Sequence, residues 1–401
     1  MQPISAGVVS ALVAFTSTFA VVLAGLSAVG ADPAQAAGGL MVVTVLMGLG
    51  SILLAVWSRQ PITIAWSTPG AALLASTGAV EGGWPAAVGA FLVVGLLVVA
   101  TGLIPALGDL IARIPPAVAQ AMLAGVLLQL CLGPIEAAVA QPAGVLPVIL
   151  VWLVGLRLFP RWAVPSAFAA AAVVVAVHVL RTGQSIDPAG FVPHLHLTAP
   201  QLSHLTAPQL SAPAVLGLAV PLFLVTMASQ NVPGAAVMQG LGYRIPWRRS
   251  MTVTGLGSLL GATGGAPGVN LAAISAALAA GPEAGEDRSR RWIASVASGC
   301  LLVLIGLGAG AFGALVSLAP EGVIPAVAGL ALLGTFASSL RAALERTEDL
   351  VPAAVTFAVV ASGVSVAGMS AAFWALVAGL SVRWVLRWGR TVPTPDSDRA
   401  G

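Results

Sequence analysis

Long hydrophobic stretches follow one another along almost the whole chain, from Ile4 to Leu386, and short turns with a charge, a proline or paired glycines separate them. Their length of roughly 20 residues matches the hydrocarbon thickness of a bilayer. Because they are rich in Ala, Leu, Val and Gly and do not alternate at every second residue, they predict membrane helices and not barrel strands. About fourteen spans are predicted, at residues 5–30, 38–57, 61–79, 84–107, 115–132, 143–159, 162–180, 213–238, 250–263, 265–281, 291–317, 322–340, 350–366 and 370–388.

One long polar interval, Arg181 to Ala212, divides seven predicted spans from seven others. We therefore expect a first seven-span repeat at 1–181, an external connecting loop at 182–212, a second repeat at 213–388 and a cytoplasmic tail at 389–401. The third span would start from the inner side and the tenth from the outer side, which predicts an inverted repeat.

The composition excludes soluble folds. The chain is 58% hydrophobic and 8% charged, whereas soluble globular proteins carry roughly 25% charged residues. We find no nucleophile, acidic pair or metal cluster at membrane depth, so we do not expect an enzyme.

The positive charges indicate the orientation. Arginines lie singly or in pairs between apolar runs and form no patch suited to nucleic acid, so no nucleic-acid partner is expected. If the N-terminus is cytoplasmic, 16 of the 17 arginines fall on the cytoplasmic side and only Arg181 lies outside, as the positive-inside rule requires. Both termini are thus predicted to be cytoplasmic.

Neither the cysteines nor the histidines predict a metal site. Cys131 and Cys300 lie within apolar stretches, which favours packing over a disulfide or a metal. His194, His196 and His204 lie in the polar interval with no acidic or cysteine partner. We expect no metal and no cofactor.

The third span is not a uniform helix. It begins PITIAWSTPG at 61–70, in which Ile62, Ile64 and Trp66 alternate with smaller residues, a period typical of extended backbone. Thr68 suits a helix N-cap and Pro69 the first helical position. The pattern predicts an extended segment followed by a half-helix, with Trp66 as an aromatic contact beside the break.

The tenth span repeats this device with GGAPGVN at 264–270. If Pro267 opens a second half-helix, the two helix N-termini meet near the middle of the membrane, where irregular backbone must line a cavity or be buried in protein. Each N-terminus carries about half a positive charge, and no carboxylate is predicted at that depth, so the pattern favours a monoanionic ligand. The alternative is a pair of proline-kinked packing helices.

Other polar and aromatic residues leave two interpretations open. Ser229, Gln230 and Asn231 interrupt the eighth span, and either line a site or form hydrogen bonds between helices. Asn270 would lie in the first turn of its half-helix, with the same alternatives. Phe15 and Phe19 share one helix face, as an aromatic wall or as ordinary packing.

Together PITIAWSTPGAA at 61–72, SQNVPG at 229–234 and GGAPGVN at 264–270 resemble the bacterial benzoate/proton symporter family over nearly the whole chain. That family is similar to the uracil, xanthine and sulfate permeases. The resemblance implies an all-helical inverted-repeat fold of seven plus seven spans, with a core domain of spans 1–4 and 8–11 and a gate domain of spans 5–7 and 12–14.

The resemblance also implies a substrate position between spans 3 and 10, against spans 1 and 8. The candidate substrate-binding residues are Phe15, Phe19, Trp66, Ser67, Thr68, Gly70, Ser229, Gln230, Asn231, Gly268, Val269 and Asn270. The nucleobase permeases have acidic residues where this chain has Ser229 and Val269. This departure favours an aromatic carboxylate over a neutral nucleobase, and it leaves the proton route unexplained.

We therefore expect a secondary transporter of the bacterial inner (plasma) membrane that imports benzoate or a similar aromatic carboxylate with a proton, by elevator-type movement. The expected partners are the substrate, the proton and the lipid bilayer, with a possible homodimer through the gate domain. An inorganic-anion permease of the sulfate or bicarbonate type, or an anion channel, remains the alternative.

Overall fold

The computed structural model describes residues 2–16, 18–104, 106–107, 115–182, 205–272, 274–309, 318–364, 366 and 369–388. The predicted connecting loop, apart from Thr182 and residues 205–212, and the predicted tail at 389–401 lie outside these residues. In the first half the main elements are α1 (Gln2–Thr16), α2 (Phe19–Ala28), α3 (Pro33–Ser58), β1 (Ile64–Trp66), α4 (Thr68–Thr77), α5 (Gly83–Leu103), α7 (Pro116–Ala140), α8 (Pro142–Leu158) and α9 (Ala163–Thr182).

The second half begins with a continuous helical stretch that contains two π-helical turns. Its parts are α11 (Ala212–Ala214), η3 (Val215–Ala219), α12 (Val220–Thr226), η4 (Met227–Asn231) and α13 (Val232–Gly240). The remaining elements are α14 (Trp247–Ala262), β2 (Val269–Leu271), α15 (Ile274–Ala280), α16 (Trp292–Leu307), α18 (Val323–Ala343), the short η7 (Thr347–Asp349), α19 (Leu350–Ala361) and α20 (Ala371–Arg387).

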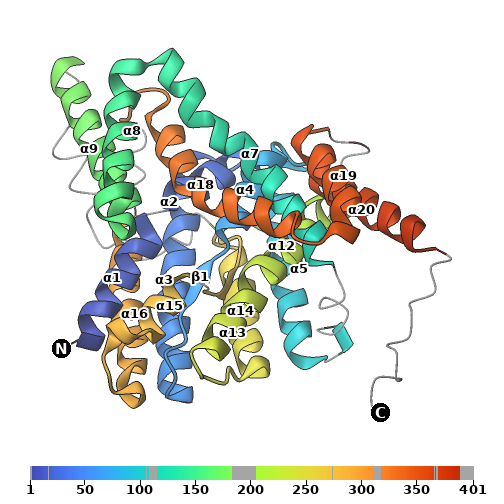
Figure 1. Cartoon of the computed structure of the whole chain (residues 1–401), viewed down its shortest axis with the longest axis horizontal. Coiled ribbons are helices and arrows are strands. Elements are labelled where there is room, and N and C mark those ends of the chain that lie inside the picture. The colour runs from blue at the N-terminus through green and yellow to red at the C-terminus, as the bar shows by residue number, and fades with distance from the viewer. Residues whose placement is uncertain are drawn as a thin grey trace, which may run out of the picture.

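The helices form two groups. In Figure 1, α7, α8, α9, α18, α19 and α20 lie across the upper part of the view, and we call them the flanking bundle. Most of α1–α5 and α11–α16 lie below them and enclose β1 near the centre; we call these the strand-containing bundle. Both bundles therefore combine elements from the two halves of the chain.

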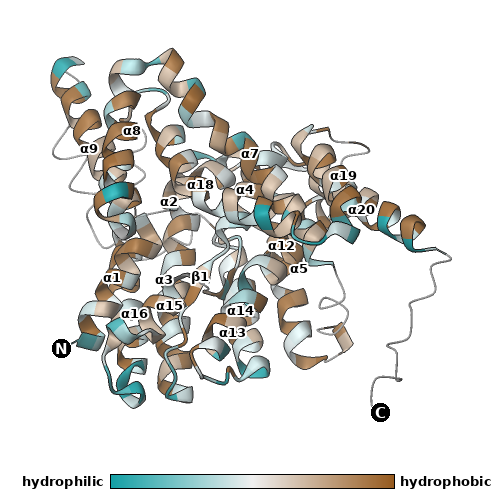
Figure 2. Cartoon of the chain, viewed as in Figure 1, coloured by the Kyte–Doolittle hydropathy of each residue, from teal (hydrophilic) through white to brown (hydrophobic). Residues whose placement is uncertain are grey.

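Eight helical stretches among the described residues are long and apolar enough to cross a membrane. Figure 2 shows hydrophobic residues along most helices, with hydrophilic ones gathered at the ends of the lower helices and on α20. Large apolar side chains such as Leu150, Val154 and Leu180 are exposed on the surface. A mostly helical protein with this surface is a multi-pass membrane protein.

Glycines let helices within the strand-containing bundle approach closely. A Cβ added to Gly48 on α3 would lie 2.5 Å from the carbonyl oxygen of Gly299 on α16, and one added to Gly299 would lie 2.6 Å from that of Gly48. Membrane helices pack through such small residues because lipid provides no hydrophobic driving force for their association. This contact fixes two of the helices around the strands.

The first predicted span is one candidate membrane span in the structure, Gln2–Ala28, but it is not a single uninterrupted helix. The sequence pattern predicted one apolar stretch at 5–30, but α1 ends at Thr16 and α2 begins at Phe19. Thr18 has φ −144° and ψ 0°, outside the helical region. The reason lies in tertiary contacts, because the Thr18 hydroxyl accepts a hydrogen bond from the Trp66 indole at 2.8 Å.

Candidate functional site

Two short strands lie at the centre of the strand-containing bundle. β1 pairs with β2 in antiparallel register, with Ile64 opposite Leu271 and Trp66 opposite Val269. The extended segment predicted at the start of the third span is therefore confirmed. Two strands of three residues are marginal alone, so the surrounding helices must hold them in place.

Serine hydroxyls from two helices bind the outer edges of this strand pair. Ser51 on α3 accepts a hydrogen bond from the Ile64 N–H at 2.8 Å. Ser258 on α14 accepts one from the Val269 N–H at 2.9 Å. Both hydroxyls are buried and satisfy N–H groups that the partner strand does not reach. Sequence reasoning missed both serines because isolated serines in apolar helices carry no distinctive motif.

Helix α4 begins directly after β1. Its N-cap is Ser67, whose hydroxyl accepts from the Gly70 N–H at 2.9 Å, so the predicted cap at Thr68 was wrong by one residue. Pro69 lies in the first turn as expected. The N–H and the hydroxyl of Thr68 make no hydrogen bond to any described residue, and this side chain is only half-buried. Thr68 therefore remains free to bind a ligand at the positive end of the helix.

The second half-helix begins later than predicted. Pro267 precedes β2, and α15 starts only at Ile274. Gly268 has φ +124°, which favours glycine and turns the chain into the strand. Residues after Pro267 use their backbone groups to pair with β1, so no helix forms there. Asn270 consequently lies within β2 and not in a helical first turn.

A buried arginine holds the far end of α15. Arg291 donates from Nη1 to the Ala280 carbonyl at 2.7 Å and from Nε to the Gly285 carbonyl at 2.8 Å. A cation at a helix C-terminus neutralises the negative end of the helix dipole. Sequence reasoning assigned this arginine only to the cytoplasmic side and missed its contact.

The two candidate asparagines are fully buried and bind backbone. Asn231 accepts from the Leu271 N–H at 2.8 Å. With its amide oriented to satisfy both neighbours, Asn270 accepts from the Ser67 N–H at 2.8 Å and donates to the Leu271 carbonyl at 2.9 Å. Both side chains are 0% exposed. The Asn231 amide nitrogen donates to the Met227 Sδ at 3.2 Å. In this conformation both side chains join the strand pair to η4 and to the start of α4, and their burial keeps their polar atoms from a ligand.

The π-helical turn η4 accounts for the polar run in the eighth span. Ser229 and Asn231 both lie in it, and the Ser229 hydroxyl donates to the Val225 carbonyl. Gln230 is half-buried, and its amide makes no hydrogen bond to a described residue. π-Helical turns inside α-helices are frequent at functional sites. Gln230, like Thr68, therefore keeps its polar atoms available.

The predicted aromatic residues form one cluster. The rings of Phe15 and Phe19 are stacked at 5.3 Å between centroids, and Phe15 lies 5.7 Å from Trp66. Phe168 on α9 meets Phe19 edge-on at 4.9 Å. Phe15, Phe19 and Trp66 are at most 2% exposed, so their ring faces are covered in this conformation. Phe168 was missed because no motif distinguishes it among 11 phenylalanines.

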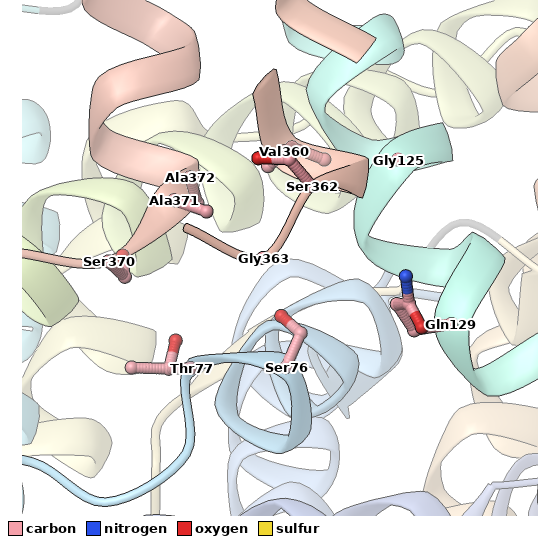
Figure 3. Close-up of a pocket in the computed structure, with 10 residues that line it drawn as sticks. All are labelled: Ser76, Thr77, Gly125, Gln129, Val360, Ser362, Gly363, Ser370, Ala371 and Ala372. Atoms are coloured by element: carbon pink, nitrogen blue, oxygen red, sulfur yellow. The ribbon is translucent and has the colours of Figure 1, made fainter. Parts of the chain in front are cut away.

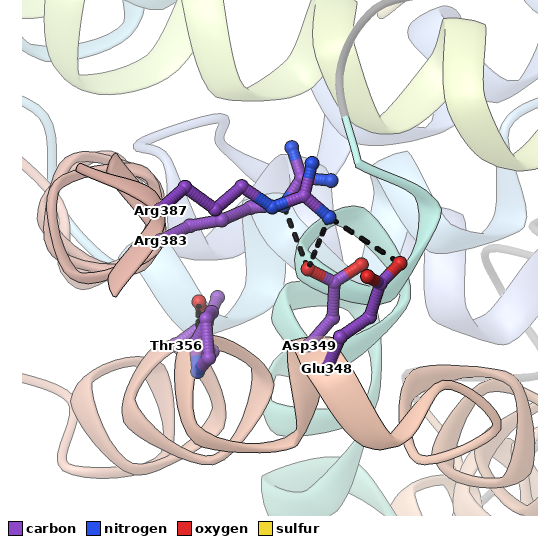
Figure 4. A network of polar contacts seen from close by, with 6 residues as sticks. Glu348, Asp349, Thr356, Arg383 and Arg387 are labelled. Atoms are coloured by element: carbon purple, nitrogen blue, oxygen red, sulfur yellow. Dashed lines mark hydrogen bonds and ion pairs between the residues drawn. The ribbon is translucent and has the colours of Figure 1, made fainter. Parts of the chain in front are cut away.

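The neighbourhood of the strand pair contains no charged candidate residue. Asp349, the fully buried carboxylate among the described residues, precedes α19 of the flanking bundle and pairs with Arg383 at 2.7 Å. Arg387 lies 3.6 Å from the same oxygen and 3.3 Å from Glu348 (Figure 4). Among the described residues, no three His, Cys, Asp or Glu side chains are placed to hold a metal ion.

Comparison with known proteins decides the family. The model of a family described as benzoate membrane transport protein matches residues 1–385. The chain belongs to this family. It is 36% identical over 376 residues to the inner membrane protein YdcO of Escherichia coli, covering 93% of both chains. It is 31% identical over 341 residues to a benzoate membrane transport protein of Acinetobacter baylyi, covering 84% of this chain and 82% of that one.

A solved structure supports the fold. The transmembrane domain of the cyanobacterial bicarbonate transporter BicA matches with a TM-score of 0.58 at 16% identity, over 96% of each chain. At this identity the likeness concerns the fold alone. This member of the benzoate transport family is therefore a membrane transporter and not an enzyme, as the sequence predicted.

Proposed function

We propose that this transporter is a secondary active importer of benzoate or a similar aromatic carboxylate, coupled to a proton. The observation that carries the substrate class is Thr68, which leaves an N–H and a hydroxyl unpaired at the positive end of α4, two residues after Trp66. An aromatic carboxylate has one ring and one negative charge. The aromatic cluster suits the ring, and the helix end suits the charge.

The candidate residues divide into contacts and frame. Thr68 and Gln230 would bind the carboxylate, and Phe15, Phe19 and Trp66 would bind the ring. The frame that holds them would comprise Ser67, Gly70, Ser229, Asn231, Gly268, Val269 and Asn270. Because the ring faces are buried against one another and Phe168, a substrate can reach them only if the two bundles move apart. This requirement supports an elevator-type movement.

In this proposal the strand-containing bundle is the core domain and the flanking bundle is the gate domain. The two domains together comprise fourteen spans, which form two inverted repeats at 1–181 and 213–388. Matched contacts support the repeat, because Ser51 and Ser258 bind equivalent strand N–H groups. The glycine contact of α3 with α16 has a counterpart between α5 and α14, where a Cβ at Gly255 would lie 3.0 Å from the Gly95 carbonyl oxygen.

The proposed orientation places both termini in the cytoplasm of a bacterial cell. The distribution of arginines supports it, and the similarity to the inner membrane protein YdcO supports the inner membrane. We also propose that the substrate carboxylate and the coupled proton share one site. A homodimer through the gate domain remains a proposal, supported by the exposed apolar side chains of α8 such as Leu150 and Leu153.

An inorganic-anion permease is the second candidate, because the structural neighbour BicA is a bicarbonate transporter. Four aromatic rings in one cluster favour an aromatic substrate over an inorganic anion. Uptake of radiolabelled benzoate into proteoliposomes under an inward proton gradient tests the two. We expect accumulation that unlabelled benzoate suppresses and that bicarbonate and sulfate leave unchanged. Suppression by bicarbonate alone would support the second candidate.

A further inference from the structure

Two adjoining cavities lie between the two bundles, away from the strand pair. The first has a volume of about 370 Å³ and the second about 300 Å³, and Thr77 and Ser370 line both. Figure 3 shows the first cavity surrounded by the end of α4, the middle of α7, the end of α19 and the start of α20. A cavity of this size can hold a small single-ring molecule.

The cavities border three turns or helix starts that share one side of the membrane in the proposed topology. Their walls include the turn after α4 with Glu81, the α19–α20 turn with Gly363, and Pro213 at the start of the eighth span. In the proposed topology these three segments all lie at the outer face of the membrane. A molecule that arrives from outside therefore meets these cavities before it meets the strand pair.

The side chains of the first cavity offer mainly acceptors. Thr77 donates its hydroxyl hydrogen to the Leu73 carbonyl at 2.8 Å, and Ser362 donates to the Val359 carbonyl at 2.7 Å. The Gln129 amide nitrogen donates to the Ala361 carbonyl at 3.0 Å. These bonds leave hydroxyl oxygens and the Gln129 carbonyl to accept from a ligand.

Donors come from the backbone of α20. The Ser370 hydroxyl donates to the Gly217 carbonyl and does not cap its own helix. The N–H groups of Ala371 and Ala372, which line the cavity, therefore have no side-chain acceptor. Among the described residues that line the two cavities, Glu81 is the only titratable one and none is an arginine.

We propose that these cavities are a second binding site, which takes the aromatic acid in its neutral, protonated form. The acid O–H would donate to an oxygen of Thr77 or Gln129, and its carbonyl would accept from the start of α20. Among the described lining residues a carboxylate would find no cation and only the N-terminus of α20 to compensate for its desolvation, and Glu81 in the second cavity would repel it. This inference rests on the proposed function. It also names the source of the coupled proton, which enters the site bound to the substrate carboxyl group.

Equilibrium binding of labelled benzamide to the purified protein tests this site. Benzamide is neutral and carries both donor and acceptor, whereas benzenesulfonate is always anionic. We expect benzamide to bind independently of pH. Unlabelled benzoate should displace it about 100-fold less well at pH 7.5 than at pH 5.5, because a carboxylic acid with a pKa near 4 loses about ten-fold of its neutral form per pH unit. Benzenesulfonate should not displace it.

Variants locate the bound benzamide. Gln129→Leu removes an acceptor and Ser76→Phe fills the cavity, so each should weaken benzamide binding by about ten-fold or more. Thr77→Val also removes an acceptor and should weaken benzamide binding. Its matched control is Thr182→Val, because Thr182 also donates to a carbonyl four residues earlier but lies on α9. Thr68→Ala at the other end of α4 should leave benzamide binding unchanged.

Unchanged benzamide affinity in both Gln129→Leu and Ser76→Phe would overturn the inference. Displacement by benzenesulfonate as effective as that by benzoate, or loss of benzamide binding in Thr68→Ala alone, would overturn it too. Benzoate uptake by the wild-type protein is measured separately. If cavity variants weaken benzamide binding while the wild type transports no benzoate, the proposed function fails and the cavity site stands.

Discussion

The hydroxyl of Ser258 accepts the N–H of Val269, the first residue of β2, at 2.9 Å. Ser51 provides the same bond to Ile64 at the first residue of β1. Each bond satisfies a buried donor of a strand that is too short to be stable alone. The two strands that separate the half-helices therefore depend on helices α14 and α3.

Replacing either serine should destabilise the protein. Ser258→Ala leaves the Val269 N–H buried without an acceptor, which costs about 1 to 3 kcal/mol. Thermal unfolding in detergent should show a lower midpoint for Ser258→Ala and Ser51→Ala. Ser338→Ala is the control, because that exposed hydroxyl donates only to the Thr335 carbonyl. Equal midpoints for all three variants would contradict this assignment.

Gln230→Ala should weaken benzoate binding and leave folding intact. Its half-buried amide has no partner among the described residues, and the loss of one hydrogen bond to a charged group costs about 1.5 to 3 kcal/mol, roughly ten-fold or more in affinity. Equilibrium binding measures the change, and Gln239→Ala, an exposed glutamine on α13, is the control. Wild-type affinity in Gln230→Ala would remove this residue from the site.

Asn270→Ala should lower stability in addition to binding. The substitution leaves the Ser67 N–H without an acceptor at the junction of β1 and α4. The start of α4, which positions Thr68, then loses a stabilising hydrogen bond. We expect a lower unfolding midpoint together with weaker benzoate binding. A variant with unchanged stability but lost binding would show that Asn270 contacts substrate directly.

Arg383→Met should be strongly destabilising. Asp349 is 0% exposed and its Oδ1 accepts from the Arg383 Nε at 2.7 Å (Figure 4). Removing one partner of a buried ion pair costs about 3 to 5 kcal/mol. Arg387→Met, which changes a half-exposed partner, should cost much less. The double variant Arg383→Met with Asp349→Asn should recover part of the lost stability. If the losses of the two single variants simply added, the two residues would not be a coupled pair.

Impermeant labelling tests the proposed topology. In a background with Cys131 and Cys300 replaced, a cysteine at Leu210, which is 74% exposed, should react on intact cells. A cysteine at Arg290 should react only after the membrane is permeabilised. The opposite pattern would reverse the orientation.

His178→Ala should retain accumulation of benzoate driven by a pH gradient in liposomes. His178 lies on α9 in the proposed gate domain, away from the strand pair. Because we propose that the substrate carries the proton, this histidine is not needed for coupling. If the variant only equilibrated benzoate while still binding it, His178 would be the coupling residue.

The sequence determined the class of protein and the elements at its centre. Long apolar runs fixed membrane helices, since the bilayer requires them. The alternation around Ile64 and Trp66 predicted a strand, and Pro69 marked a helix start, because both signals depend only on neighbouring residues. Local spacing also indicated that Phe15 and Phe19 lie together, whereas their contact with Trp66 was decided by the tertiary structure.

Only the tertiary structure decided what the polar residues do. Pro267 and Gly268 allow a helix start or a strand, and pairing with β1 selected the strand. Asn231 and Asn270 could equally have faced a ligand, but buried backbone N–H groups from distant segments took their oxygens. These hydrogen bonds depend on which buried donors and acceptors folding brings together. The sequence alone does not give the distances between residues that lie far apart along the chain.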